Sequence, residues 1–212
     1  MVERIVRRTA VALALVAAVT PVARAQEAAP QLQEDPRAAK YRDVERGFFV
    51  GLEAGYLSFL DTPTANPAAF PYAGASGGSS GGVLVGVNAG VDVGSRVALS
   101  VYAQGGNEHA NVNYGAFSVY GVGGDVRVSV LGLKDRNAFE RFFVYLHARA
   151  GYARTWPTGL FGHTDVLVAA GPGIEYYTRL RHFSIGLATD YVRATKAKAN
   201  GFAIYPTLRY TF

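Results

Sequence analysis

The chain has 212 residues, of which half are hydrophobic, 12% aromatic and only 17% charged, and its formal net charge is +5. A length near 200 residues corresponds to one domain or at most two, and the low charge with many aromatic residues excludes disorder for most of the chain. The absence of Cys excludes a disulfide scaffold, a thiolate metal site, a Cys nucleophile and a lipid-modified N-terminal Cys. The 25 Gly residues follow no three-residue period, which excludes collagen and favours a glycine- and aromatic-rich β protein.

The first 25 residues are predicted to be a signal peptide. Residues 1–8 are basic, Thr9–Thr20 is apolar, and Ala23-Arg24-Ala25 forms a small-residue cleavage site, so we expect cleavage after Ala25. The apolar run of about 12 residues is shorter than the roughly 20 that a membrane-spanning helix needs. Loss of the four Arg and one Glu of this segment lowers the formal net charge from +5 to +2. The basic character of the chain therefore gives no argument for a nucleic-acid partner.

Residues 26–46 are polar and carry nine charges of mixed sign. Asp35-Pro36 could begin a short helix that extends to about Glu45, because Pro is favoured at the first helical position. The segment is therefore either a periplasmic linker or a short helical docking element.

From Gly47 onward, segments of about ten residues alternate between apolar and polar or small residues, as strands with two different faces do. In Val83–Val93, for example, every second residue is Val or Ala. Eight segments are predicted as strands: Phe48–Phe59, Val83–Val93, Val97–Gln104, Gly121–Val130, Phe142–Tyr152, Val168–Tyr176, Phe183–Tyr191 and Phe202–Phe212. Pro172 marks a bulge or a weak point in the sixth, because Pro donates no ladder hydrogen bond.

Two kinds of barrel have this alternation, and the polar face distinguishes them. A soluble barrel turns its apolar face inward, whereas a membrane barrel turns it toward lipid. The polar face of these strands is rich in Gly, Ser and Tyr and lacks Lys, which suits a lumen that side chains fill. The prediction is an all-β, eight-stranded antiparallel up-and-down transmembrane β-barrel over residues 47–212.

Aromatic residues are expected to form two belts at the two membrane interfaces. One belt comprises Tyr56, Phe59, Phe117, Tyr120, Tyr152, Tyr191 and Phe202. The other comprises Phe48, Phe142, Tyr176, Phe183, Tyr210 and Phe212. The connections on the outer side are predicted at about 61–81, 107–114, 155–165 and 192–200. Those on the periplasmic side are predicted at 94–96, about 131–140 and about 178–182, of which 131–140 is long for its side.

The last strand, with Leu208, Tyr210 and the terminal Phe212, resembles the end of small bacterial outer-membrane barrels of the OmpA-like superfamily. The resemblance covers about residues 47–212 and implies that these three residues are an assembly signal for the outer-membrane insertion machinery. The segment Tyr41–Phe49 also resembles the start of barrels associated with adventurous gliding motility.

Charged residues on the inward face are the first candidate functional site. They are Glu53, Asp92, Asp125, Arg127, His147, Arg149, Glu175, Asp190 and Arg209. Because unpaired charges in a narrow lumen are costly, we expect a salt-bridge network that plugs the barrel. The alternative is a gated or proton-selective path.

The outer connections are the second candidate site, because long loops on a rigid scaffold often carry binding. Arg193, Lys196 and Lys198 are predicted to form a basic patch that contacts lipopolysaccharide phosphates. Gly-rich runs such as Gly121–Gly124 lie within strands, so they predict no nucleotide site.

An enzyme site is the third candidate, since a few small barrels act on lipids. His147 has no evident inward Ser at its level, and His182 is predicted at a periplasmic turn. His109 and His163 in outer connections could form a metal pair, although isolated loop His residues are usually only solvated. We expect no metal, no cofactor and no enzymatic activity.

The sequence therefore predicts an exported protein of the bacterial outer membrane, with a signal peptide (1–25), a periplasmic segment (26–46) and a barrel (47–212). The predicted function is a non-enzymatic anchor or interaction scaffold, in contact with outer-membrane lipid and with a periplasmic or surface protein, for example as part of a motility or envelope complex. A narrow channel for solutes or protons is the alternative, and a lipid-modifying enzyme is a more distant one.

Overall fold

The computed structural model describes residues 44–60, 80–110, 116–135, 139–156, 164–180 and 182–212. The predicted signal peptide and nearly all of the segment 26–46 lie outside these residues. The strands are β1 (Phe48–Phe59), β2 (Ser80–Val93), β3 (Val97–Ala110), β4 (Ala116–Lys134), β5 (Glu140–Trp156), β6 (Asp165–Tyr177), β7 (Phe183–Ala194) and β8 (Asn200–Thr211). Within the described residues, no helix is long and apolar enough to span a membrane.

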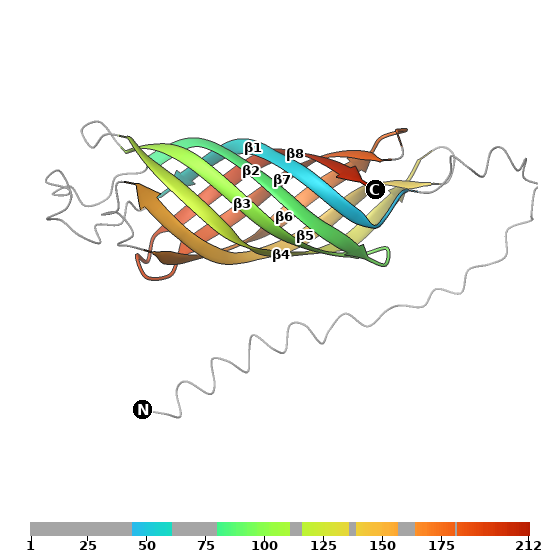
Figure 1. The fold of residues 1–212 in the computed structure, drawn as a ribbon. Coiled ribbons are helices and arrows are strands. Elements are labelled where there is room, and N and C mark those ends of the chain that lie inside the picture. The colour runs from blue at the N-terminus through green and yellow to red at the C-terminus, as the bar shows by residue number, and fades with distance from the viewer. Residues whose placement is uncertain (1–43, 61–79, 111–115, 136–138, 157–163, 181) are drawn as a thin grey trace, which may run out of the picture. The chain divides into compact units, whose positions relative to one another are not determined.

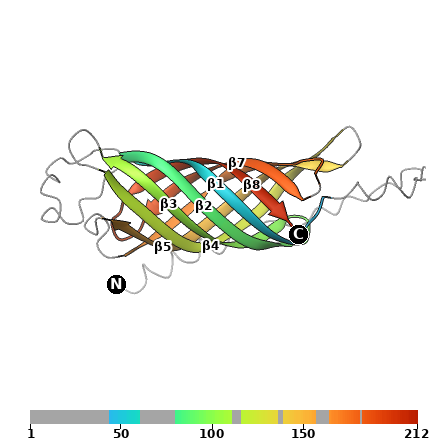
Figure 2. The same cartoon turned by 45° about the horizontal axis from the view of Figure 1, so that its top comes forward.

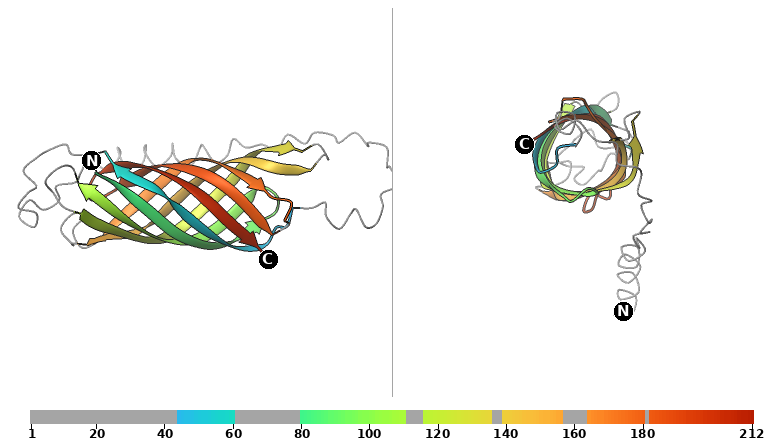
Figure 3. Two further views of the ribbon diagram at one scale, coloured as in Figure 1. Left: turned by 90° about the horizontal axis from the view of Figure 1, so that it is seen from above. Right: turned by 90° about the vertical axis from the view of Figure 1, so that its right-hand side faces the viewer.

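The eight strands form a closed antiparallel barrel, which confirms the predicted fold. Each strand pairs with the next in sequence, and β8 pairs with β1 to close the sheet. The strands tilt strongly across the barrel (Figure 1), and the view along its axis shows an unbroken ring (Figure 3).

The barrel has two different ends. At one, which we call the terminal end, β1 begins, β8 ends and the connections at 94–96, 135–139 and 178–182 are short. At the other, which we call the loop end, the strands connect through 60–79, 111–115, 157–164 and 195–199. Figure 2 shows β1 beside β8 with the C-terminus at the terminal end.

The outward face of the barrel is apolar around the whole circumference. Val83, Val101 and Leu146 are each more than half exposed, at 61%, 65% and 53%. Val-rich alternation favours strands because branched side chains pack well on a pleated surface. An uncovered apolar belt of this kind is what lipid-facing strands present, so the structure has the exterior of a membrane barrel.

The β4–β5 hairpin corrects the predicted connection at 131–140. Its strands continue to Lys134 and begin again at Glu140, with register shifts between Ser129 and Leu131 and between Leu133 and Lys134. The first shift turns the consecutive residues Val130 and Leu131 both outward, which interrupts the period of two and hides the strand in the sequence. This hairpin projects beyond its neighbours at the terminal end (Figure 1).

The predicted placement in the aromatic belts is wrong for two residues. Phe59 and Phe117 are 0% and 2% exposed and point into the barrel, because each falls on the inward parity of its strand. Among the remaining predicted belt residues, Tyr120, Tyr152 and Phe48 are exposed on the outer surface as expected.

Pro172 is a weak point but not a bulge. Its pairing with Leu146 on β5 keeps the register, whereas pairing with β7 skips Gly171 and Pro172 and resumes in the same register at Gly173. The missing N–H of Pro172 thus interrupts one of its two ladders.

Candidate functional site

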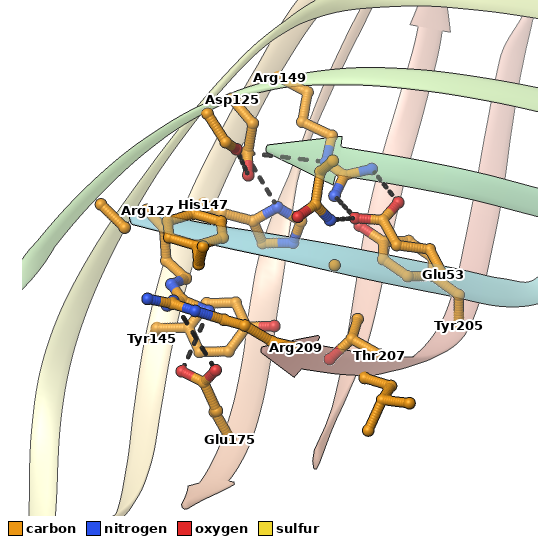
Figure 4. A pocket seen from close by; sticks show the side chains of 16 residues that line it. Glu53, Asp125, Arg127, Tyr145, His147, Arg149, Glu175, Tyr205, Thr207 and Arg209 are labelled. Atoms are coloured by element: carbon orange, nitrogen blue, oxygen red, sulfur yellow. Dashed lines mark hydrogen bonds and ion pairs between the residues drawn. The ribbon is translucent and has the colours of Figure 1, made fainter. Parts of the chain in front are cut away.

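The nine inward charged residues all lie in the lumen, where strand alternation directs them from every strand except β3. Most have side chains less than 7% exposed; Arg127 and Asp125 are the most accessible, at 16% and 12%. The structure brings them into two neighbouring clusters, most of which are visible in Figure 4.

The first cluster is centred on Arg149 of β5. Its guanidinium forms a bidentate pair with Glu53 of β1, with Nη1 2.8 Å from Oε2 and Nη2 2.5 Å from Oε1. Its Nε lies 3.7 Å from Asp125 of β4, and Asn88 donates to Glu53 at 2.7 Å. Because β1 and β5 are four strands apart in the closed ring of eight, the Glu53–Arg149 pair ties opposite walls of the barrel together.

Two Tyr rings enclose the Arg149 guanidinium. Its central carbon lies 5.1 Å from the centre of the Tyr102 ring and 5.0 Å from that of Tyr205. Glycines make room for Tyr102: a Cβ on Gly123 or Gly151 would lie 2.8 or 2.7 Å from its hydroxyl oxygen. Cation–π contacts of this kind are stronger away from water, so Arg149 is held in place as well as neutralised.

His147 links the first cluster to β7. Its Nδ1 lies 3.5 Å from Asp125 and its Nε2 3.0 Å from Asp190. The Tyr205 hydroxyl donates to Asp190 at 2.7 Å. The imidazole therefore has an acid on each side and is buried among aromatic rings.

The second cluster lies toward the terminal end. Arg127 is 3.1 Å from Glu175, which also accepts a hydrogen bond from Ser184 at 2.6 Å. Arg209 of β8 pairs with Asp92 of β2 and lies 3.8 Å from Glu175. Because β8 is adjacent to β1, the Arg209–Asp92 pair reaches across the closing seam of the sheet.

The network has a net negative formal charge. The nine residues comprise five acids, three Arg and His147, so even with His147 protonated their formal charges sum to −1.

The network leaves little space in the lumen. Between the side chains the structure leaves a cavity of about 40 Å³, with a second of about 10 Å³ nearer the loop end. About 10–15 Å³ of space measured in this way holds one water molecule, so the first cavity has room for a few waters and the second for about one.

An apolar layer separates this network from the loop end. It includes Leu57, Phe59, Leu84, Phe117 and Leu167, each at most 4% exposed. Apolar constrictions of this kind oppose ion passage by excluding water.

The apolar layer holds a carboxylate that the sequence reasoning missed. Glu108 is 0% exposed, and within the described residues neither of its carboxylate oxygens has a hydrogen-bond partner. The predicted third strand ended at Gln104 and placed Glu108 in a loop, but β3 continues to Ala110. The alternation continues past Gly105 and Gly106, with Glu108 at an inward position, and this pattern could have predicted the longer strand.

The terminal end is closed by aromatic residues. Phe143 and Tyr177 pack edge to face, with ring centres 5.5 Å apart. Arg46, just before β1, lies over both rings, at 5.1 Å from Phe143 and 5.9 Å from Tyr177. The lumen is thus occupied at the terminal end, in the middle and toward the loop end.

The predicted basic residues lie at the loop end. Arg193 is exposed on β7 and donates to Asn200 at 2.9 Å. Lys196 and Lys198 are exposed on the turn between β7 and β8, and Lys196 Nζ donates to the carbonyl of Thr164 at 2.9 Å.

The predicted assembly signal lies on the outer surface of the terminal end. Leu208 is 43% and Phe212 63% exposed. The Tyr210 ring packs edge to face against Phe183 and Phe212, at 5.0 and 5.1 Å between centres. The motif therefore belongs to the aromatic surface at this end.

The histidines show no nucleophile or metal arrangement within the described residues. His147 is flanked by acids, and His182 lies 2.8 Å from Glu45. No group of three His, Cys, Asp or Glu side chains that could hold a metal occurs among the residues described. The side chain of His109 and all of His163 lie outside the described part.

Comparisons with known proteins give the fold. No protein-family model and no curated protein matches the chain. Among solved structures, the chain is similar to Neisserial surface protein A, with 15% identity, a TM-score of 0.56 and coverage of 78% of this chain and 97% of that one. It also matches OprG from Pseudomonas aeruginosa, with 11% identity, a TM-score of 0.47 and coverage of 79% of this chain and 98% of that one. A third match is Ail of Yersinia pestis, with 12% identity, a TM-score of 0.39 and coverage of 78% of this chain and 99% of that one. These comparisons give no support to the resemblance to motility-associated barrels, which stays a prediction. The closed antiparallel barrel of residues 48–211 is the fold of the small eight-stranded outer-membrane β-barrels.

Proposed function

We propose that the chain is a bacterial outer-membrane protein that acts as a non-enzymatic anchor or interaction scaffold, with a lumen that does not conduct. The observation that carries this proposal is the filled lumen, in which the charges pair with one another and an apolar layer follows them. The exposed apolar exterior supports the membrane location, and the aromatic end with Leu208, Tyr210 and Phe212 supports recognition by the insertion machinery.

Single-channel recording of the refolded chain in a planar bilayer tests the closed lumen. Insertion is checked separately by the heat-dependent gel mobility of folded barrels. The proposal predicts a silent bilayer with inserted protein. Steady unitary steps that change in size when Arg149 is replaced by Gln would show a pore and overturn it.

The scaffold role is tested by deleting sequence outside the described residues. We expect removal of residues 27–43 or 63–78 to leave insertion intact and to abolish crosslinking to a protein partner in cells. If neither deletion changes any crosslink, the scaffold role is wrong even if the lumen is closed.

A proton path is the second candidate, favoured by the contacts of His147 with Asp125 and Asp190. Proton flux into vesicles carrying a pH-sensitive dye distinguishes the two functions. A flux that His147→Gln removes would establish the path, whereas a flux equal to that of protein-free vesicles would exclude it.

A further inference from the structure

All Lys and Arg residues near the loop end lie on one side of the barrel. They are Arg154 on β5, Arg193 on β7, and Lys196 and Lys198 on the turn before β8, and we call these four residues the basic rim. The outward residues near the loop end of β1 to β4 include Tyr56, Ser58, Asn107 and Ser118, and none is charged. The sequence of the other connections at this end (60–79, 111–115 and 157–163) contains no Lys or Arg.

No exposed acid among the described residues offsets the basic rim. The acids of this region within the described residues, Glu108 and Asp165, are both 0% exposed, and the sequence of the connections adds one acid, Asp61. The exposed charge of the described loop end is therefore positive and confined to β5, β7 and one turn.

The turn that presents the lysines is fixed by the buried Asp165. Its carboxylate accepts hydrogen bonds from the backbone N–H groups of Lys196 at 2.8 Å and Ala197 at 2.9 Å, and from the Thr195 hydroxyl at 3.2 Å. A turn held in this way presents its side chains with little further loss of conformational entropy.

Lys198 occupies a position that suits Gly better. Its φ is +58°, in the left-handed region, which costs free energy for a residue with a side chain. The turn therefore holds Lys198 in one defined backbone conformation, with its side chain exposed.

Apolar and aromatic surface lies directly on the membrane side of these bases. Tyr152, Tyr191 and Phe202 are 67%, 54% and 42% exposed on β5, β7 and β8. The Tyr191 hydroxyl donates to Asn200, the residue that also accepts from Arg193. A ligand that carries both phosphate and acyl chains would meet bases and apolar surface together, whereas a soluble anion would use only the bases.

Resting on the proposed outer-membrane location, we propose that the basic rim binds the phosphate groups of a phosphorylated glycolipid of the outer leaflet. The acyl chains of this lipid lie along the aromatic surface of β5, β7 and β8. Arg and Lys bind phosphate through charge-assisted hydrogen bonds, and the four bases lie beyond Tyr152 and Tyr191 toward the loop end.

Lipid binding can be followed by the fluorescence of the single Trp of the chain. Trp156 is 69% exposed and lies two residues beyond Arg154 on the outward face of β5. The refolded chain in detergent is titrated with bisphosphorylated lipid A and with dephosphorylated lipid A of the same acyl composition, and the Trp156 fluorescence is followed. We expect saturable binding of the phosphorylated lipid only.

Two double variants locate the site. Arg193→Gln/Lys198→Gln is expected to weaken binding about tenfold, since each exposed charge pair contributes a few-fold. Lys134→Gln/Arg179→Gln removes two exposed bases at the terminal end and should leave the affinity unchanged. Lys198→Gly removes one ammonium group, so we expect it to weaken binding. Because Gly suits the positive φ at this position, we expect no loss of barrel stability.

Three results would overturn the inference. Equal binding of the phosphorylated and dephosphorylated lipids would exclude phosphate recognition, and equal weakening by both double variants would exclude the basic rim as its place. Inorganic pyrophosphate that competes as tightly as the lipid would show a soluble-anion site instead. A chain that fails to show the heat-dependent mobility of a folded barrel would contradict the proposed function, which separates that failure from failure of lipid binding.

Discussion

Replacement of Arg149 by Met should destabilise the barrel strongly. The change removes the bidentate partner of Glu53, whose side chain is 2% exposed and which, among the described residues, keeps a hydrogen bond from Asn88 at 2.7 Å. It also removes the cation that lies 3.7 Å from Asp125. Removal of one partner of a buried ion pair costs about 3–5 kcal/mol. Glu53 is left without a cation, whereas Asp125 keeps His147 at 3.5 Å, so we expect a loss within that range.

The measurement is denaturant unfolding of the refolded barrel in lipid vesicles, followed by Trp156 fluorescence. The matched control is the double variant Glu53→Gln/Arg149→Met, which removes the buried charge together with its partner. We expect it to be at least about 2 kcal/mol more stable than the sum of the single variants predicts. If Arg149→Met costs less than about 1 kcal/mol, or if the single effects simply add, the ion pair does not hold the walls together and the reasoning is wrong.

Three further changes test other parts of the structure. Glu108→Met should raise the unfolding free energy by about 1–2 kcal/mol, because it replaces a buried carboxyl group without a hydrogen-bond partner by an apolar side chain of similar length; a clear loss of stability would show that the carboxyl group has a partner. Asp165→Ala should expose the turn it holds, so that trypsin cleaves after Lys196 or Lys198 much faster than in the unchanged protein, and equal cleavage rates would refute this role. Gly173→Val should cost about 1–3 kcal/mol, since a Cβ there would lie 2.3 Å from the Tyr145 ring, whereas Gly124→Ala, where the nearest atom is 3.9 Å away, serves as the control.

The faces of the strands could be predicted from the sequence, because a period of two assigns each side chain to one side of a sheet. All nine lumen charges follow from this rule. The errors arose where the rule was broken or abandoned. The register shift at Ser129–Leu131 interrupts the alternation before the end of β4. Phe59 and Phe117 follow the inward parity of their strands and not the usual interfacial position of aromatic residues.

The pairing of the charges could not be predicted. Period two gives the face of a residue but not its height in the barrel, which depends on the register of every strand pair. That Arg149 meets Glu53, or that Asp165 binds the turn at 195–197, follows only from the closed sheet. For the same reason, the confinement of all four loop-end bases to one side becomes visible only in the structure.

Labelling of two adjacent residues of β3 tests the central claim most directly. The chain contains no Cys, so Val101→Cys, at an outward position 65% exposed, and Ser100→Cys, beside Asp125 in the lumen, each provide a single thiol. In vesicles, an outer face covered by lipid and a lumen filled by side chains predict that a charged, membrane-impermeant thiol reagent modifies neither residue. The same account predicts that a lipid-soluble reagent modifies position 101 only. Modification of position 100 by the charged reagent would show an open pore, and modification of position 101 by it would show that the apolar face meets water.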